Sequence, residues 1–241
     1  MLGGPIHKAR LSAAHFSCWG AQAWGVLTGT HEPMVHEALR RTLPVGGVFI
    51  DVGCNIGYTT LLAASLVGPT GRVVALDAQR ESVDATRTNA RLNGMEQVEV
   101  VYAAAAATNG QADVIVTQDP LWTRLASVSE HPLEVRRDTV LTVTLDDLIA
   151  DLNVPVVDVV KIDVEGAELD VLVGMAGLLT KQRPVVICEM HAHNEAFCDA
   201  MRDLNYTVVN LDGVTPVAHA DDNVHALCEP NNSIHRGTAS R

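Results

Sequence analysis

Positive charge is scarce in this sequence, which has 17 Lys and Arg residues against 29 Asp and Glu residues and a net charge of −12. A strongly acidic chain repels polyanions, so we expect neither DNA nor RNA as a partner. No uninterrupted apolar stretch approaches the length that crosses a membrane, and residues 1–10 lack the apolar core of a signal peptide. We therefore expect a cytoplasmic protein without a membrane partner.

Cysteine is also sparse. The five cysteines are odd in number, scattered and free of any CxxC pair (Cys18, Cys54, Cys188, Cys198 and Cys228). This pattern argues against a disulfide framework or a zinc site and favours reduced thiols. At 241 residues the chain is long enough for one sizeable α/β domain and too short for two comfortable ones.

Strand and helix patterns alternate from residue 45 to about residue 211, which is typical of a parallel sheet covered by helices. The expected strands are 48–52, 72–76, 98–102, 158–162 and 185–188, and the expected helices are 59–66, 81–92 and 167–179. Two late β-rich stretches, 207–211 and 224–227, are expected to close the sheet as an antiparallel pair. The predicted fold is α/β and doubly wound, with a mostly parallel sheet.

We divide the chain into an N-terminal arm, residues 1–44, and a main domain, residues 45–241, with an insertion at 105–155. Within the insertion, 113–117 and 139–143 are predicted strands, and a polar loop is expected around 118–138. The arm contains Phe16, Trp19 and Trp24, which either pack over the sheet or form a lid or substrate wall.

The most informative segment runs from Val48 to Ala64. An apolar strand ends on Asp51, a turn with Gly53, Asn55 and Gly57 follows, and an apolar helical pattern comes next. This strand, loop and helix hold a nucleotide-like ligand at the carboxyl edge of a parallel sheet. The loop reads D-x-G-x-N-x-G and not G-x-G-x-x-G, and its carboxylate would repel a pyrophosphate. It suits a ligand with an ammonium group, such as the amino-acid end of S-adenosylmethionine.

Two more predicted strands end on an acid, at Asp77 and Asp163, and the ends of parallel strands face one crevice. Asp77 lies roughly twenty residues past the glycine loop, where an acid binds ribose hydroxyls; its alternative role is to cap the next helix. Lys161 and Asp163 lie two apart on a strand and share a face. Glu165 lies on the following turn, as a site residue or as a helix cap.

The fifth predicted strand leads into Glu189, His191 and His193, which would share a face if the strand extends that far. Asp163, Glu189 and His191 could bind a divalent cation such as Mg²⁺. Alternatively, one histidine is the general base that takes a proton from a substrate hydroxyl, or both are exposed loop residues.

Five motifs occur in order along the chain: DVGCNIGYTTL, GRVVALDAQRESVDATRTNARLNG, TVTLDDLI, VDVVKIDVEGAELDVLVGM and RPVVICEMH. Together they resemble the FkbM-type methyltransferases, which are S-adenosylmethionine-dependent O-methyltransferases with a Rossmann-like class I methyltransferase fold. The glycine loop alone is generic to class I methyltransferases, whereas KIDVEGAE is far more diagnostic. The resemblance covers about residues 32–191.

The resemblance implies a set of cofactor-binding residues. Asp51, Gly53, Asn55 and Gly57 would line the methionine end, Asp77 the ribose, and Ala104 the adenine. Glu32 and Asp163 complete the predicted cofactor site. Cys54 stands where the family usually has alanine, and is interpreted as a small buried side chain, although a thiol near a helix N-terminus can be activated.

The sequence therefore predicts an O-methyltransferase that uses S-adenosylmethionine and acts on a hydroxyl of a small molecule, of sugar or natural-product type by resemblance. Asp163, Glu165, Glu189 and His191 are the predicted catalytic residues, because an alcohol needs a base or a metal as its proton leaves. The alternatives are a nicotinamide-dependent oxidoreductase, disfavoured by the glycine spacing and Asp51, and a regulator that binds the cofactor without chemistry.

Overall fold

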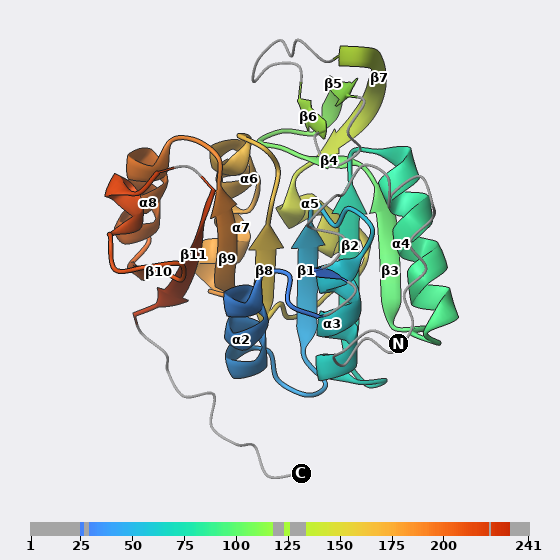
Figure 1. Cartoon of the computed structure of the whole chain (residues 1–241), viewed down its shortest axis with the longest axis horizontal. Helices are drawn as coiled ribbons and strands as arrows, with labels where there is room; N and C mark the ends of the chain where they lie inside the picture. The colour runs from blue at the N-terminus through green and yellow to red at the C-terminus, as the bar shows by residue number, and fades with distance from the viewer. Residues whose placement is uncertain (1–24, 27–28, 118–122, 126–133, 222, 232–241) are drawn as a thin grey trace.

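The computed structural model describes residues 25–26, 29–117, 123–125, 134–221 and 223–231. At its centre is a seven-stranded sheet with the order β10-β11-β9-β8-β1-β2-β3 (Figure 1). The strands are β1 (Val48–Val52), β2 (Arg72–Asp77), β3 (Val98–Tyr102), β8 (Val159–Ile162), β9 (Val185–Met190), β10 (Tyr206–Asn210) and β11 (Val224–Pro230). Among the described helices, none is long and apolar enough to cross a membrane.

Strand pairing confirms the predicted fold class. β3, β2, β1, β8 and β9 pair in parallel, and β11 runs antiparallel to both β9 and β10. The late pair is therefore antiparallel, as the sequence predicts. All five strands of the parallel part lie within one or two residues of their predicted bounds.

Alternate strand residues point to opposite faces of the sheet, and a hydrophobic core lies on each face. Phe49, Val73 and Val159 pack with α2 (Pro33–Thr42), α3 (Tyr58–Val67) and α4 (Arg80–Leu92). On the other face lie α5 (Leu145–Asp151), α6 (Glu168–Gly174), α7 (Ala176–Lys181) and α8 (Asn194–Asp203), with the short 3-10 helix η1 (Val217–His219). Strands β1, β2, β8 and β9 are mostly buried on both faces, which explains their continuous apolar runs, whereas the edge strand β3 is half-buried throughout.

The single helix expected over 167–179 is wrong in one respect, because the structure divides it into α6 and α7. Gly174 ends α6 in close contact with Ala106, whose carbonyl oxygen would lie 2.1 Å from a Cβ at this position. The Asp146 carboxylate of α5 accepts hydrogen bonds from the amides of Gly177 and Leu178, at 2.7 Å each, and so fixes the start of α7. Tertiary contacts cause the break.

The segment between β3 and β8 forms a second sheet, in the order β4-β7-β5-β6, at the carboxyl end of the main strands (Figure 1). Its strands are β4 (Ala104–Ala105), β5 (Gly110–Thr117), β6 (Thr123–Leu125) and β7 (Glu134–Val143). The two strands predicted here are present. The predicted polar loop over 118–138 is too long, because β6 and the first half of β7 lie within it; residues 118–122 and 126–133 lie outside the described residues.

Helix α2 packs on the main domain through a buried histidine. The His36 side chain is buried, its ring centroid lies 5.2 Å from that of Tyr58, and its Nε2 has no hydrogen-bond partner among the described residues. Burial and the charge of Arg40 lower the pKa of His36 to about 4. Phe16, Trp19 and Trp24 lie outside the described residues, so the lid role of the arm stays a prediction.

We expect the free energy of unfolding of His36→Leu to fall less, as the pH is lowered, than that of the unsubstituted protein. Between pH 6.5 and 4 the unfolded chain takes up a proton at His36 and the folded chain does not, so the folded state loses stability as the pH falls. Between pH 7.5 and 4.5 this loss is about 2 kcal/mol. Urea unfolding at both pH values should show a smaller drop for His36→Leu than for the unsubstituted protein or for the exposed-site control His219→Leu. Equal drops in all three proteins would contradict the assignment.

Candidate active site at the carboxyl edge of the sheet

The loop between β1 and α3 has the backbone conformation that its glycines predict. Gly53, Asn55 and Gly57 all have positive φ, at 80°, 50° and 84°. The Asp77 carboxylate at the end of β2 accepts hydrogen bonds from the backbone amides of Asn55 and Gln79, at 2.8 Å each. Asp77 thus joins the two loops that follow β1 and β2, in addition to any contact with a ligand.

Gly53 lies against the end of β8. A Cβ at Gly53 would come within 1.8 Å of the Asp163 carbonyl oxygen, which is an impossible contact. Close approach of a ligand to the main chain is one reason for glycine at this position. The structure supplies a second reason, since the protein's own main chain already excludes a side chain here.

A cleft opens between this loop, the end of β8 and the residues before α2. Its lining comprises His31, Glu32, Asp51, Gly53, Cys54, Asn55, Ile56, Tyr58, Thr59, Lys161 and Asp163. Five predicted cofactor-site residues therefore meet in one place together with Lys161, whereas Gly57 and Asp77 are not part of this lining. Ala104 lies elsewhere, buried in β4 against Val114, Val140 and Ala167. Cys54 is buried, and burial raises the pKa of its thiol, so it fits the interpretation as an inert side chain.

Lys161 is the buried cation of the cleft. Its side chain is 3% exposed, its Nζ lies 2.8 Å from Asp163 Oδ2, and it pairs in register with Asp51 on β1. Burial lowers the pKa of Lys161, but Asp163, Glu32, Asp51 and Glu189 together raise it well above its usual value. The ammonium group therefore keeps its proton.

The acids around Lys161 differ in their environments. Burial raises the pKa of Asp51 to about 6, against the effect of Lys161, and its Oδ1 has no hydrogen-bond partner within the described chain. Burial also raises the pKa of Glu32, but Lys161 and His31 outweigh it and hold that pKa well below its usual value. His31 Nε2 lies 3.1 Å from Glu32 Oε1.

The predicted catalytic residues gather around His191. Its Nε2 lies 3.7 Å from both Glu165 Oε1 and Glu189 Oε1, and 3.9 Å from Asp163 Oδ1. Its Nδ1 lies 2.9 Å from Glu168 Oε1. Burial lowers the pKa of His191, but Glu168 and the other acids raise it to about 9, so the ring is protonated at neutral pH.

His193 does not join this group. Strand β9 ends at Met190, and His193 has a φ of 60° immediately before α8, with an exposed side chain. The strand therefore does not extend far enough for Glu189, His191 and His193 to share one face, because the chain turns away after Met190.

Sequence reasoning missed three residues at this edge: Glu168, Asp212 and His225. Glu168 is 1% exposed and closes the KIDVEGAE motif, so its place in the motif was an available signal. His225 and Asp212 carry no local signal. His225 reaches the site because β11 pairs with β9, which places it opposite Glu189, and Asp212, just after β10, contacts His225.

A family model, the Methyltransferase FkbM domain, matches residues 51–212. The chain belongs to the FkbM-type S-adenosylmethionine-dependent methyltransferases. The match begins at the acid that opens the glycine loop and ends at Asp212, so it includes the whole cluster around Lys161 and His191 except Glu32 and His225.

Two relatives show how the FkbM chain compares with characterised sequences. It is 37% identical over 92 residues to the ribosomal protein L11 methyltransferase of Caldanaerobacter subterraneus subsp. tengcongensis, covering 37% of this chain and 29% of that protein. It is 28% identical over 146 residues to the hexuronic acid methyltransferase AglP of Haloferax volcanii, covering 60% of this chain and 56% of AglP. The chain thus matches less than two thirds of the length of either relative.

Two solved structures share the fold of this FkbM chain at 13% identity each. Methyltransferase FkbM from Methylobacillus flagellatus KT has a TM-score of 0.53, and the superposition covers 93% of this chain and 56% of that one. Precorrin-6y C5,15-methyltransferase from Geobacter metallireducens GS-15 has a TM-score of 0.54, and the superposition covers 94% of this chain and 96% of that one. These similarities confirm the predicted class I methyltransferase fold.

We expect Gly53→Ala to destabilise the FkbM fold by about 2–4 kcal/mol, since a positive φ costs about 1–2 kcal/mol for alanine and the forced contact with Asp163 adds a similar amount. Gly94→Ala is the matched control, because Gly94 also has a positive φ, of 66°, with open space around it. Urea unfolding should show a loss of about 1–2 kcal/mol for Gly94→Ala. Equal losses in the two variants would rule out the contact.

Proposed function

We propose that this chain is an S-adenosylmethionine-dependent O-methyltransferase that acts on a hydroxyl group of a small molecule of sugar or natural-product type. The proposal rests on two groups of residues that lie next to each other. The glycine-loop cleft and the cluster of Asp163, Glu165, Glu189 and His191 share the carboxyl edge of the sheet, and Asp163 belongs to both. A methyl donor in the cleft would thus lie beside groups that hold or accept protons.

The charges in the cleft fit this cofactor. S-adenosylmethionine carries an ammonium and a sulfonium group, and it supplies a methyl group that an oxygen nucleophile can attack. We assign the ammonium to Asp51 and Asp163, because Asp51 Oδ1 is buried without a hydrogen-bond partner in the described residues, and Glu32 lines the same cleft. We assign the ribose hydroxyls to Asp77 and the adenine to the neighbourhood of Ala104.

The protein's task is to orient the acceptor and to receive its proton. The pKa of an alcohol is about 16, so its oxygen needs a neighbouring base or cation as the proton leaves. We place the proton acceptor among Asp163, Glu165, Glu189 and His191. For His191 to act, its ring must first lose the proton that the surrounding acids stabilise. The Mg²⁺ site predicted on Asp163, Glu189 and His191 stays a prediction, and Lys161 competes with it for Asp163 at 2.8 Å.

The acceptor class follows from the family resemblance and from one relative, AglP, whose name gives a hexuronic acid as its substrate. The other relative is named for a ribosomal protein, so a protein acceptor is the competing class. Incubation with labelled S-adenosylmethionine and either uronic acids or ribosomal protein L11 separates the two. Thermal shift with S-adenosylmethionine and with NAD separates the methyltransferase from the oxidoreductase, and turnover of any acceptor excludes a non-catalytic regulator.

We expect Asp77→Ala to weaken S-adenosylmethionine binding by about 1–3 kcal/mol, because the ribose loses its acceptor and the loop loses the anchor of Asn55. This corresponds to a Kd raised roughly 10- to 100-fold in calorimetry. Asp84→Ala, which removes an exposed acid of α4, is the control and should bind normally. Unchanged affinity in folded Asp77→Ala would remove Asp77 from the cofactor site.

We expect the double variant Asp163→Asn with His191→Ala to lose methyl transfer by a factor of about 100 or more, because general-base catalysis alone contributes 10²–10⁴-fold. His219→Ala, at an exposed histidine, is the control for turnover. A folded double variant with full activity in the presence of EDTA would move the catalytic site away from this cluster.

A further inference from the structure

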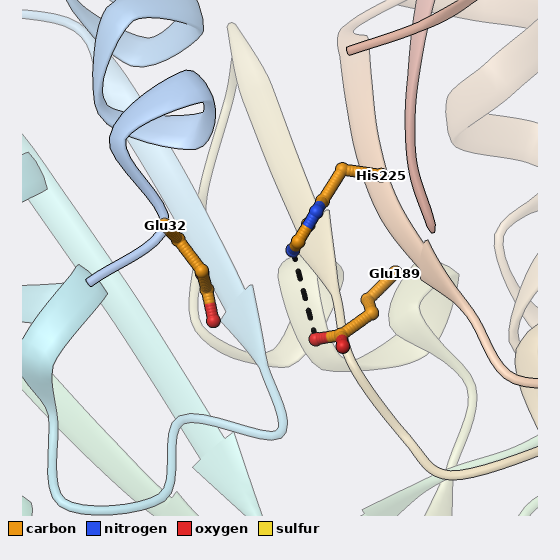
Figure 2. A group of neighbouring side chains, drawn as sticks. All are labelled: Glu32, Glu189 and His225. Atoms are coloured by element: carbon orange, nitrogen blue, oxygen red, sulfur yellow. Dashed lines mark ion pairs between the residues drawn. The ribbon is translucent and has the colours of Figure 1, made fainter. Parts of the chain in front are cut away.

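A second group of potential metal ligands lies beside the catalytic cluster. Figure 2 shows Glu32, Glu189 and His225 with their polar ends directed toward one another. Glu32 immediately precedes α2, Glu189 lies near the end of β9, and His225 lies opposite it on β11. One ligand atom from each residue lies within 4.8 Å of the other two.

The orientation of His225 is fixed by Asp212. His225 Nδ1 lies 2.9 Å from Asp212 Oδ2, and the backbone amide of His225 donates to the same oxygen at 2.6 Å. A carboxylate accepts hydrogen bonds, so Nδ1 carries the proton and Nε2 presents a lone pair. Carboxylates hold metal-binding histidines in this way.

His225 Nε2 is the unusual atom of the group. The residue is 9% exposed, and Nε2 has no hydrogen-bond partner among the described residues. The nearest charged group is Glu189 Oε2 at 3.8 Å, which is too long for a hydrogen bond. With a neutral ring, this buried lone pair faces Glu189 and Glu32 with no hydrogen-bond donor between them in the described residues, an arrangement that a bound cation would stabilise.

We propose that Glu32, Glu189 and His225 bind a divalent transition-metal cation. Two carboxylates with one imidazole suit Mn²⁺ or Zn²⁺ better than Mg²⁺, which prefers oxygen ligands alone. With bonds near ~2.1 Å, a cation joins ligand atoms up to about 4.2 Å apart, so small side-chain rotations complete the set. Three protein ligands leave positions open for a substrate oxygen.

This set differs from Asp163, Glu189 and His191 in its charge surroundings. Lys161 Nζ contacts Asp163 directly at 2.8 Å, whereas it acts on Glu32 and Glu189 at longer range, and three carboxylates surround His191 Nε2. The role of the cation in catalysis, which is to bind the acceptor hydroxyl and lower its pKa, rests on the proposed function. Binding of the cation does not depend on that function.

The test measures metal binding to the full chain after EDTA treatment, without cofactor or acceptor. Calorimetry with Mn²⁺ and with Zn²⁺ should show one equivalent bound by the unsubstituted protein. His225→Ala and Glu32→Gln should each weaken binding at least 100-fold, and Asp212→Asn about 10-fold, as for a residue that orients a ligand. His191→Ala should bind within a factor of about three of the unsubstituted protein, and so should the exposed control His219→Ala.

Two outcomes would overturn the proposal: no binding of either metal by the folded protein, or loss of binding in His191→Ala with retention in His225→Ala. Circular dichroism establishes that each variant is folded, and Glu32→Gln decides the matter if His225→Ala does not fold. Failure of the methyl-transfer assay with intact metal binding would reject the proposed function alone. Transfer that persists in EDTA, together with absent metal binding, would reject this inference alone.

Discussion

The structure of the site depends on one buried cation, Lys161. It lies on β8 next to β1, and four carboxylates from four different segments act on it: Glu32, Asp51, Asp163 and Glu189. Carboxylates removed from water are costly unless a positive charge or hydrogen bonds compensate them. Removal of one member of a buried ion pair typically costs about 3–5 kcal/mol, because the remaining charge has no partner. Lys161 thus makes it possible for the carboxyl edge of the sheet to hold its acids at all.

One lysine does not neutralise four carboxylates, and the excess negative charge gives the edge its chemical character. Asp51 keeps one oxygen without a hydrogen-bond partner in the described chain, and Glu189 has its pKa raised to about 7 by burial and by Asp163. Such a site attracts cationic ligands and repels phosphate-rich ones. The same excess negative charge is thus consistent with three features. The loop lacks a dinucleotide fingerprint, the site fits a sulfonium cofactor, and a metal site is proposed beside it.

The sequence predicted the parts of the fold that local burial controls. The bounds of β1 and β3 agree to the residue, because each strand is a short, mainly apolar run between turn residues. The division between α6 and α7 could not be predicted, since it depends on Asp146 from another helix. At the site, the KIDVEGAE motif placed Lys161 and Asp163 correctly on one strand end. His225 was missed because its only connection to Glu189 is a strand pairing between residues 36 positions apart.

Two histidines, His191 and His225, flank Glu189, and their different surroundings suit them to different roles. Each has its Nδ1 2.9 Å from a carboxylate, Glu168 for His191 and Asp212 for His225. The Nε2 of His191 faces three further carboxylates within 3.9 Å, so this ring is suited to hold a proton. The Nε2 of His225 has one carboxylate, Glu189, at 3.8 Å and a second, Glu32, farther away, and in the neutral ring its lone pair faces the position of the proposed cation. The antiparallel strand β11 makes the two roles possible, because it brings the imidazole of His225 to Glu189 from the side of β9 opposite β8.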